Sequence, residues 1–156
     1  MTSIKGVPAT FRFAVLGLTV LICFASLSCQ TYSTGLQQSL ARADETAAIA
    51  ALHSIAVAEQ TYSISNGGKY GTMQELRDAG YLDSRFNSAN GGVKDYSLTI
   101  NTNPQSSEAA ASFSCNADPS NSGTQAGRHF YLDSTSTAIH VNPTQPATAS
   151  DPIAQP

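Results

Sequence analysis

The stretch Ala41–Tyr62, ARADETAAIAALHSIAVAEQTY, decides the fold, because its apolar residues recur three or four positions apart, as on one face of an α-helix. The positions predicted to face the core are Leu52, Ile55, Ala56, Glu59 and Tyr62, and Ala48 and Ile49 continue this face backwards. The alanines combine high helix propensity with small side chains, which let a sheet approach closely. We therefore expect the rest of the chain to pack on this helix.

The ends of the helix are marked by capping and turn residues. Ser39 or Asp44 is a plausible cap, and Asp44 and Glu45 then lie in the first turns, at the positive end of the helix dipole. The helix is predicted to end at residues 65–68, where Asn and Gly allow a positive φ. Glu59 faces the core, so we expect it to bond backbone groups at residues 67–71.

A short second helix is predicted after these glycines. Thr72 and Glu75 have the spacing of a capping box, and Gly80 is a stop signal. The apolar side of this helix comprises Met73, Leu76, Ala79 and Leu82. Residues 83–92 are expected to form a loop.

The remaining sequence changes to the alternation that is typical of strands. Alternating segments occur at residues 96–101, 109–117, 127–133 and 137–142, separated by polar turns. They predict a meander of about four antiparallel strands. The expected fold class is thus α+β: one long N-terminal helix packed on a small antiparallel sheet, with one short extra helix. Residues 143–156, rich in proline, are expected to be a disordered tail.

The first 28 residues resemble an export leader. Lys5 and Arg12 precede the apolar run Phe13–Leu27, which is shorter than the roughly 20 residues that span a bilayer comfortably. The run ends at Cys29, so three alternatives stay open: cleavage after Ser28, lipid attachment to Cys29, and retention of the leader as a membrane helix. The expected organisation is a leader (1–28), a linker (29–40), a globular domain (41–142) and the tail.

Charge and cysteine content exclude some protein classes. The formal net charge of the chain is −3, and no run of Lys or Arg provides the basic patch that nucleic acids need. Cys23 lies in the leader, and Cys115 lies in a predicted strand facing inward. We expect Cys115 to be a buried thiol rather than the partner of Cys29 in a disulfide.

Candidate catalytic and metal-binding residues are few. His129 and His140 lie on neighbouring predicted strands with Asp133 near the turn, but two histidines fall short of a closed metal site. His53 is expected on the flank of the long helix, and no phosphate loop follows Gly67–Gly68 or Gly91–Gly92. We therefore expect neither a metal nor a cofactor, and no enzymatic activity.

The order of these segments resembles that of type IV pilins and type II secretion pseudopilins. The likeness is carried by AAIAALHSIAVAEQTY at 47–62, by Gly-Lys-Tyr-Gly-Thr at 68–72, by LRDAGYL at 76–82 and by the closing FYLDSTSTAIHVN at 130–142. The resemblance implies a non-enzymatic structural or interaction protein of the bacterial cell envelope, whose partners are other pilin-like or envelope subunits.

The leader differs from that of a processed pilin. Phe13 follows Arg12 instead of a glycine, and no Glu occurs before Glu45. In pilins, the resemblance implies, such a Glu neutralises an N-terminal amine in the apolar filament core. An alternative function is therefore an extracytoplasmic lipoprotein module that is anchored through Cys29 and does not enter a filament. Either way, the protein is expected to be exported and either membrane-anchored or extracellular.

Overall fold

The computed structural model describes residues 9–87, 93, 95–120 and 127–155, with side chains described from Gly35 onward. Two compact units are separated at Ser39 and Leu40, and the fold below belongs to the second unit, Leu40–Pro156. Its elements are helix α1 (Ala9–Ser65), which begins in the first unit, α2 (Met73–Asp78), the 3-10 helix η1 (Ser84–Asn87), β1 (Tyr96–Asn103), β2 (Ser112–Pro119), β3 (His129–Asp133) and β4 (Ser136–Asn142). The predicted α+β class is confirmed.

Helix α1 begins well before the predicted start at Ala41. Residues 29–40, predicted to be a linker, are helical, since they contain no proline and Gly35 costs only about 1 kcal/mol of helix propensity. Asp44 and Glu45 therefore do not lie in a first turn, and Ser39 bonds the Leu36 carbonyl within the helix instead of capping it. The predicted end is confirmed, because Gly67 and Gly68 follow Ser65 with φ of 64° and 85°.

Helix α2 forms as its sequence predicts. The Thr72 hydroxyl accepts from the Glu75 N–H, and the Glu75 carboxylate accepts from the Thr72 N–H at 2.7 Å, which completes the capping box. Leu76 is fully buried. Gly80, with φ of 76°, lies just beyond the end of the helix. The segment expected to be a loop contains η1, and residues 88–92 of that segment, including Gly91 and Gly92, lie outside the described residues.

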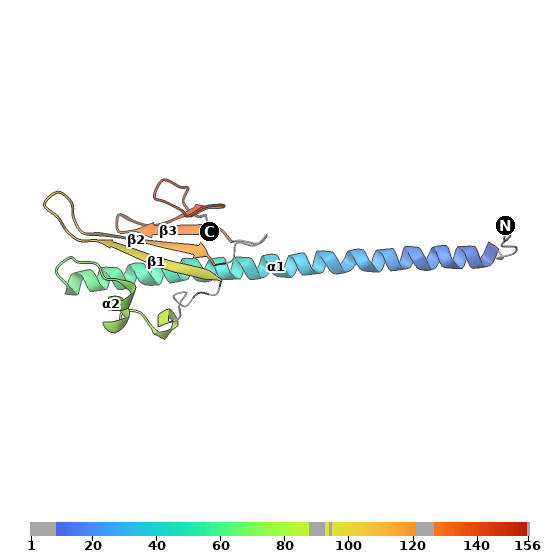
Figure 1. Ribbon diagram of the computed structural model, residues 1–156, viewed down its shortest axis with the longest axis horizontal. Helices are drawn as coiled ribbons and strands as arrows, with labels where there is room; N and C mark the ends of the chain where they lie inside the picture. The colour runs from blue at the N-terminus through green and yellow to red at the C-terminus, as the bar shows by residue number, and fades with distance from the viewer. Residues whose placement is uncertain (1–8, 88–92, 94, 121–126, 156) are drawn as a thin grey trace, which may run out of the picture. The chain divides into compact units, whose positions relative to one another are not determined.

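The four strands form one antiparallel sheet in the order β1-β2-β3-β4, a meander as predicted. The sheet lies along one side of α1, and α2 lies on another side of the same helix (Figure 1). One buried cluster joins the two layers. It includes Leu52 and Ile55 of α1, Cys115 and Phe113 of β2, and Phe130 and Leu132 of β3. The predicted core face of α1 is buried, with Ile49 and Tyr62 partly exposed.

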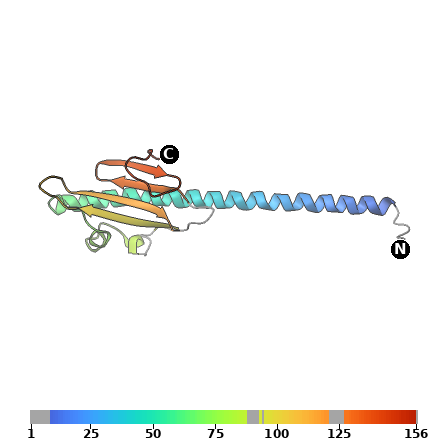
Figure 2. The same cartoon turned by 45° about the horizontal axis from the view of Figure 1, so that its top comes forward.

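The segment after β4 differs from the predicted disordered tail. The Val141 N–H donates to Pro152 O at 2.8 Å, and the Ala154 N–H donates to Ile139 O at 2.7 Å, so the segment covers the outer edge of β4 (Figure 2). Ala147 is buried, and its carbonyl accepts from the side chain of Asn116. The prediction failed because these bonds join an aperiodic, proline-rich segment to strands far away in sequence.

Candidate functional site

Glu59 is a fully buried carboxylic acid in the core-facing side of α1. Its Oε2 accepts from the Gly71 N–H at 2.8 Å, as predicted, while Oε1 has no hydrogen-bond partner among the described residues. A side chain at position 71 would crowd Tyr62 and Leu76, so glycine lets the loop approach this closely. Burial raises the pKa of Glu59 to about 7, although the bond from Gly71 lowers it and Glu75 adds to the rise.

Cys115 lies near Glu59 in the buried layer and is a free thiol, as predicted. Burial raises the pKa of the Cys115 thiol strongly, and the nearby Glu59 carboxylate raises it further. A thiol that stays protonated is a poor nucleophile. The arrangement at Glu59 and Cys115 therefore supplies packing rather than covalent chemistry.

Glu45 connects α1 to the start of β3, an arrangement that sequence reasoning missed. Its carboxylate accepts from the Arg128 guanidinium at 2.8 Å and from the Arg128 N–H at 3.1 Å. Partial burial raises the pKa of Glu45, but the bonds and charge of Arg128 outweigh that effect and lower it overall. The Tyr96 hydroxyl donates to the Arg128 carbonyl. Helix dipole compensation, the role predicted for Glu45, is therefore replaced by an ion pair across 83 residues of sequence.

His129 and His140 have separate partners. The strand register places His129 opposite Asn142 and His140 opposite Tyr131. His129 Nδ1 lies 2.6 Å from the Asp118 carboxylate, whereas His140 Nδ1 lies 2.6 Å from the Asp151 carbonyl. Within the part of the chain that the structure describes, no three His, Cys, Asp or Glu residues are placed to hold a metal ion. His53 is exposed on the helix flank, as expected.

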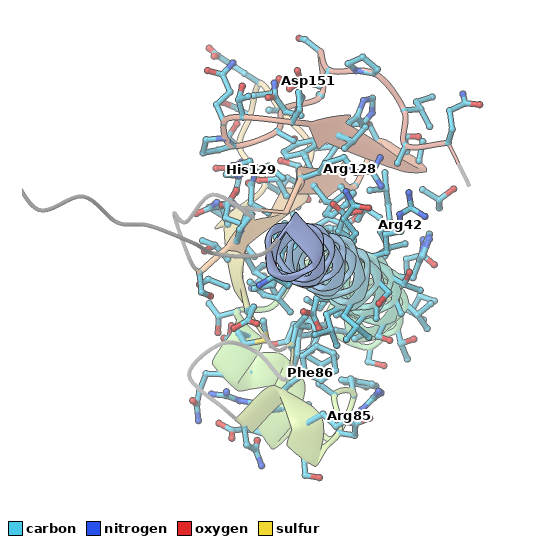
Figure 3. The ribbon with its side chains drawn as sticks, turned by 90° about the vertical axis from the view of Figure 1, so that its right-hand side faces the viewer. Arg42, Arg85, Phe86, Arg128, His129 and Asp151 are labelled. Carbon is cyan, nitrogen blue, oxygen red and sulfur yellow. The ribbon has the colours of Figure 1, made fainter. Side chains whose placement is uncertain are left out.

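A groove runs along α1 on the side where η1 lies. It has a volume of about 520 Å³ between α1 residues that include His53, Val57 and Thr61 and the segment Gly80–Phe86. A smaller hollow of about 110 Å³ continues beside Ala47 and Ala50, and Arg85 and Phe86 line both. Viewed along α1, Arg85 and Phe86 lie on the opposite side of the helix from Arg128, His129 and Asp151 (Figure 3).

The helix face that forms one wall of this groove carries a second uncharged stripe, which the sequence reasoning did not separate from the core face. Its members are spaced alternately three and four positions apart: Leu40, Ala43, Ala47, Ala50, Ser54, Val57, Thr61 and Ile64. All are exposed except Ser54, which is half-buried, and the exposed fractions of Val57 and Ile64 are 64% and 85%. Surface helices usually present charged residues on such a face. The signal in the sequence was this regular spacing.

The side chains of the predicted leader and of Cys29 lie outside the described part of the chain. Where the structure describes the chain, no helix has both the length and the apolar character needed to cross a membrane. Comparisons with protein-family models, with curated proteins and with solved structures find no match to this chain.

Proposed function

We propose that this protein is a non-enzymatic, pilin-like or pseudopilin-like subunit of the bacterial cell envelope. The observation that carries the proposal is that α1 has two faces without charges within the globular unit: an apolar face buried against the sheet, and a mostly apolar, largely exposed face formed by the stripe from Leu40 to Ile64. A helix that is apolar on both sides normally has partners on both sides. A face of this spacing fits another helix, because knobs-into-holes packing repeats every 3.5 residues.

The partners that we propose are helices of neighbouring envelope or pilin-like subunits. The stripe has no charged residue, so a matching helix face can approach it without burying an unpaired charge. Its alanines favour a close approach of two helix backbones. Ser54, Val57 and Thr61 of the stripe line one wall of the groove. Its other wall includes the buried ring of Phe86 and Arg85, which pairs with Asp83 at 2.8 Å.

The variant Val57→Asp tests this proposal, because it places a charge in the exposed stripe without touching the core. We expect the variant to keep the thermal midpoint of the parent. We also expect it to be absent from the high-molecular-mass envelope assemblies, as measured by sedimentation and native electrophoresis of membrane extracts. Gln60→Asp is the matched control on an exposed helix position outside the stripe, and it should assemble normally. Normal assembly of Val57→Asp would contradict the proposal.

A lipoprotein module is the second candidate, favoured by the position of Cys29 directly after the apolar leader. Intact mass and N-terminal sequencing of the membrane-extracted protein separate the two. A chain that starts at a diacylated Cys29 excludes filament assembly through the leader. A chain that retains residues 13–27 excludes the lipoprotein.

A further inference from the structure

The two edges of the sheet differ in how they are covered. Along Ile139 to Val141, the outer edge of β4 already bonds the chain's own segment at Pro152 and Ala154. Strand β1 pairs only with β2, in an unbroken register from Tyr96↔Pro119 to Asn103↔Ser112. Among the strands of the described chain, β1 is therefore the one with an uncovered edge.

The register shows which backbone groups face this edge. The Ser120 N–H donates to Asp95 O at 2.8 Å, which makes them a hydrogen-bonded pair, and such pairs alternate along an antiparallel ladder. The N–H and C=O groups of every second residue, Leu98, Ile100 and Thr102 included, therefore point away from β2. Pro119, which has no N–H, lies opposite Tyr96 and fits this alternation. No hydrogen bond from the described residues reaches the backbone of Leu98, Ile100 or Thr102.

The edge also lacks the features by which proteins usually block strand addition. Natural edge strands carry lysine, proline or a bulge, or they are very short. Strand β1 is eight residues long, YSLTINTN, with no charge, no proline and no register shift. Leu98 and Ile100 are only half-buried at the border of the core, so an added strand would cover them.

We infer that β1 is a docking edge for the same strand of a second copy, giving a two-fold dimer with a continuous eight-stranded sheet. Symmetry selects this occupant. A head-to-tail contact would need the edge of β4, which is covered along Ile139 to Val141, whereas pairing of β1 with itself uses the same edge twice and closes. A strand without charges meets no like charge when it pairs with its own copy. This inference does not depend on the proposed function.

The alternation also predicts the register. Antiparallel pairing centred on Thr99 places Leu98 opposite Ile100 of the second copy and Tyr96 opposite Thr102. The backbone N–H and C=O groups of these residues, which point away from β2, then bond those of the second copy. The two Thr99 side chains then lie opposite each other across the symmetry axis, as a close non-hydrogen-bonded pair. Because Thr99 is exposed in the monomer, it can be changed with little effect on the core.

Sedimentation equilibrium of the full chain in detergent, over a range of concentrations, tests the dimer. We expect the parent chain to dimerise and Thr99→Lys to weaken dimerisation by about tenfold or more, because it places two cations opposite each other. Thr137→Lys is the matched control, since Thr137 is an exposed threonine on β4, and it should dimerise like the parent. An equal mixture of Thr99→Lys and Thr99→Glu should restore a mixed dimer.

Thermal midpoints of the three variants verify that each is folded. A parent chain that stays monomeric would overturn the inference. Pairing of β1 with a strand of a different protein would overturn it too. Dimerisation of Thr99→Lys equal to that of the parent would also overturn it, because the association would then use another surface. Loss of envelope assembly in Val57→Asp with an intact Thr99-dependent dimer, or the reverse, distinguishes this interface from the helix stripe.

Discussion

At the scale of the residue, Glu59 is the most unusual group in the globular unit. It is fully buried, one carboxylate oxygen bonds Gly71, and the other has no partner among the described residues. A buried carboxyl in this setting is more stable when protonated. The charged group that acts on it is Glu75, whose carboxylate opposes the ionisation of Glu59.

Glu59 should make the stability of the domain depend on pH. Its pKa is about 7 in the fold and 4.5 as the ordinary value, so the folded state binds more protons between these limits. The stabilisation from protonated Glu59 is complete below pH 4.5 and is lost as pH rises through 7. We expect a loss on the order of 2 kcal/mol, measured by urea denaturation at a series of pH values.

Glu59→Gln should remove most of this dependence and should be more stable than the parent at pH 8. The matched control is Glu108→Gln, an exposed residue in a turn, which should keep the pH profile of the parent. A Glu59→Gln profile that still falls between pH 4.5 and 7 would assign the effect to another group.

The Glu45–Arg128 pair is the second prediction at this scale. The Glu45 side chain is only 13% exposed, and Arg128 also donates its backbone N–H, so we expect a coupling of about 1 kcal/mol in a double-mutant cycle of Glu45→Gln and Arg128→Met. The pair Asp83–Arg85 has side chains 53% and 70% exposed, and the same cycle there should give a coupling near zero. Equal couplings would show that burial does not strengthen the first pair.

At the scale of the element, α1 joins a core face and an exposed face in one helix. Leu52 has no exposed surface, whereas Val57, five positions later, is mostly exposed. The sheet covers the first face through side chains of β2 and β3. The second face is largely exposed, so we expect the two faces to respond differently to the same substitution.

Leu52→Asp should destabilise the domain by several kcal/mol, because it buries an unpaired charge and removes a core side chain. Val57→Asp should change the free energy of unfolding by about 0.5 kcal/mol or less. Chemical denaturation of both variants, in monomeric conditions, compares the faces directly. Similar losses in the two variants would mean that the assignment of the faces is wrong.

At the scale of the whole molecule, the segment after β4 decides which edges of the sheet remain open. It bonds the backbone of Ile139 and Val141, and the Asp151 carboxylate accepts from the Asn142 side chain at 2.8 Å. The bond from the backbone of Thr148 is the main reason that the pKa of Asp151 is lowered. The segment therefore covers the β4 edge along Ile139 to Val141, whereas no described segment bonds the outer edge of β1.

Deletion of residues 143–156 should have two effects. We expect a loss of about 2 to 4 kcal/mol in unfolding free energy, from several hydrogen bonds worth about 1 kcal/mol each. We also expect species larger than a dimer in light scattering, because an uncovered β4 edge permits head-to-tail strand pairing. A stable, strictly dimeric truncated chain would contradict the edge-covering role. Asp151→Asn should weaken the hydrogen bonds that hold the segment after β4, while the segment still covers the outer edge of β4.

By itself, the sequence determined the features that arise from neighbours along the chain. The 3.6-residue period of Ala41–Tyr62, the capping box at Thr72 and Glu75, and the alternation in four segments each depend on local geometry, and all are present in the structure. Even the bond from Gly71 to Glu59 was predictable, because a carboxylate on a core face needs a donor and the adjacent glycine loop provides one.

Only the tertiary structure decided the features that join distant parts of the chain. Four features depend on strand register and on which edge a segment covers. They are the Glu45–Arg128 pair, the separation of His129 from His140, the hydrogen-bonded segment around Asp151, and the β1 edge that no described segment bonds. Such contacts have no periodicity that a sequence can display, since the free energy that selects them comes from burial and hydrogen bonding across the folded sheet.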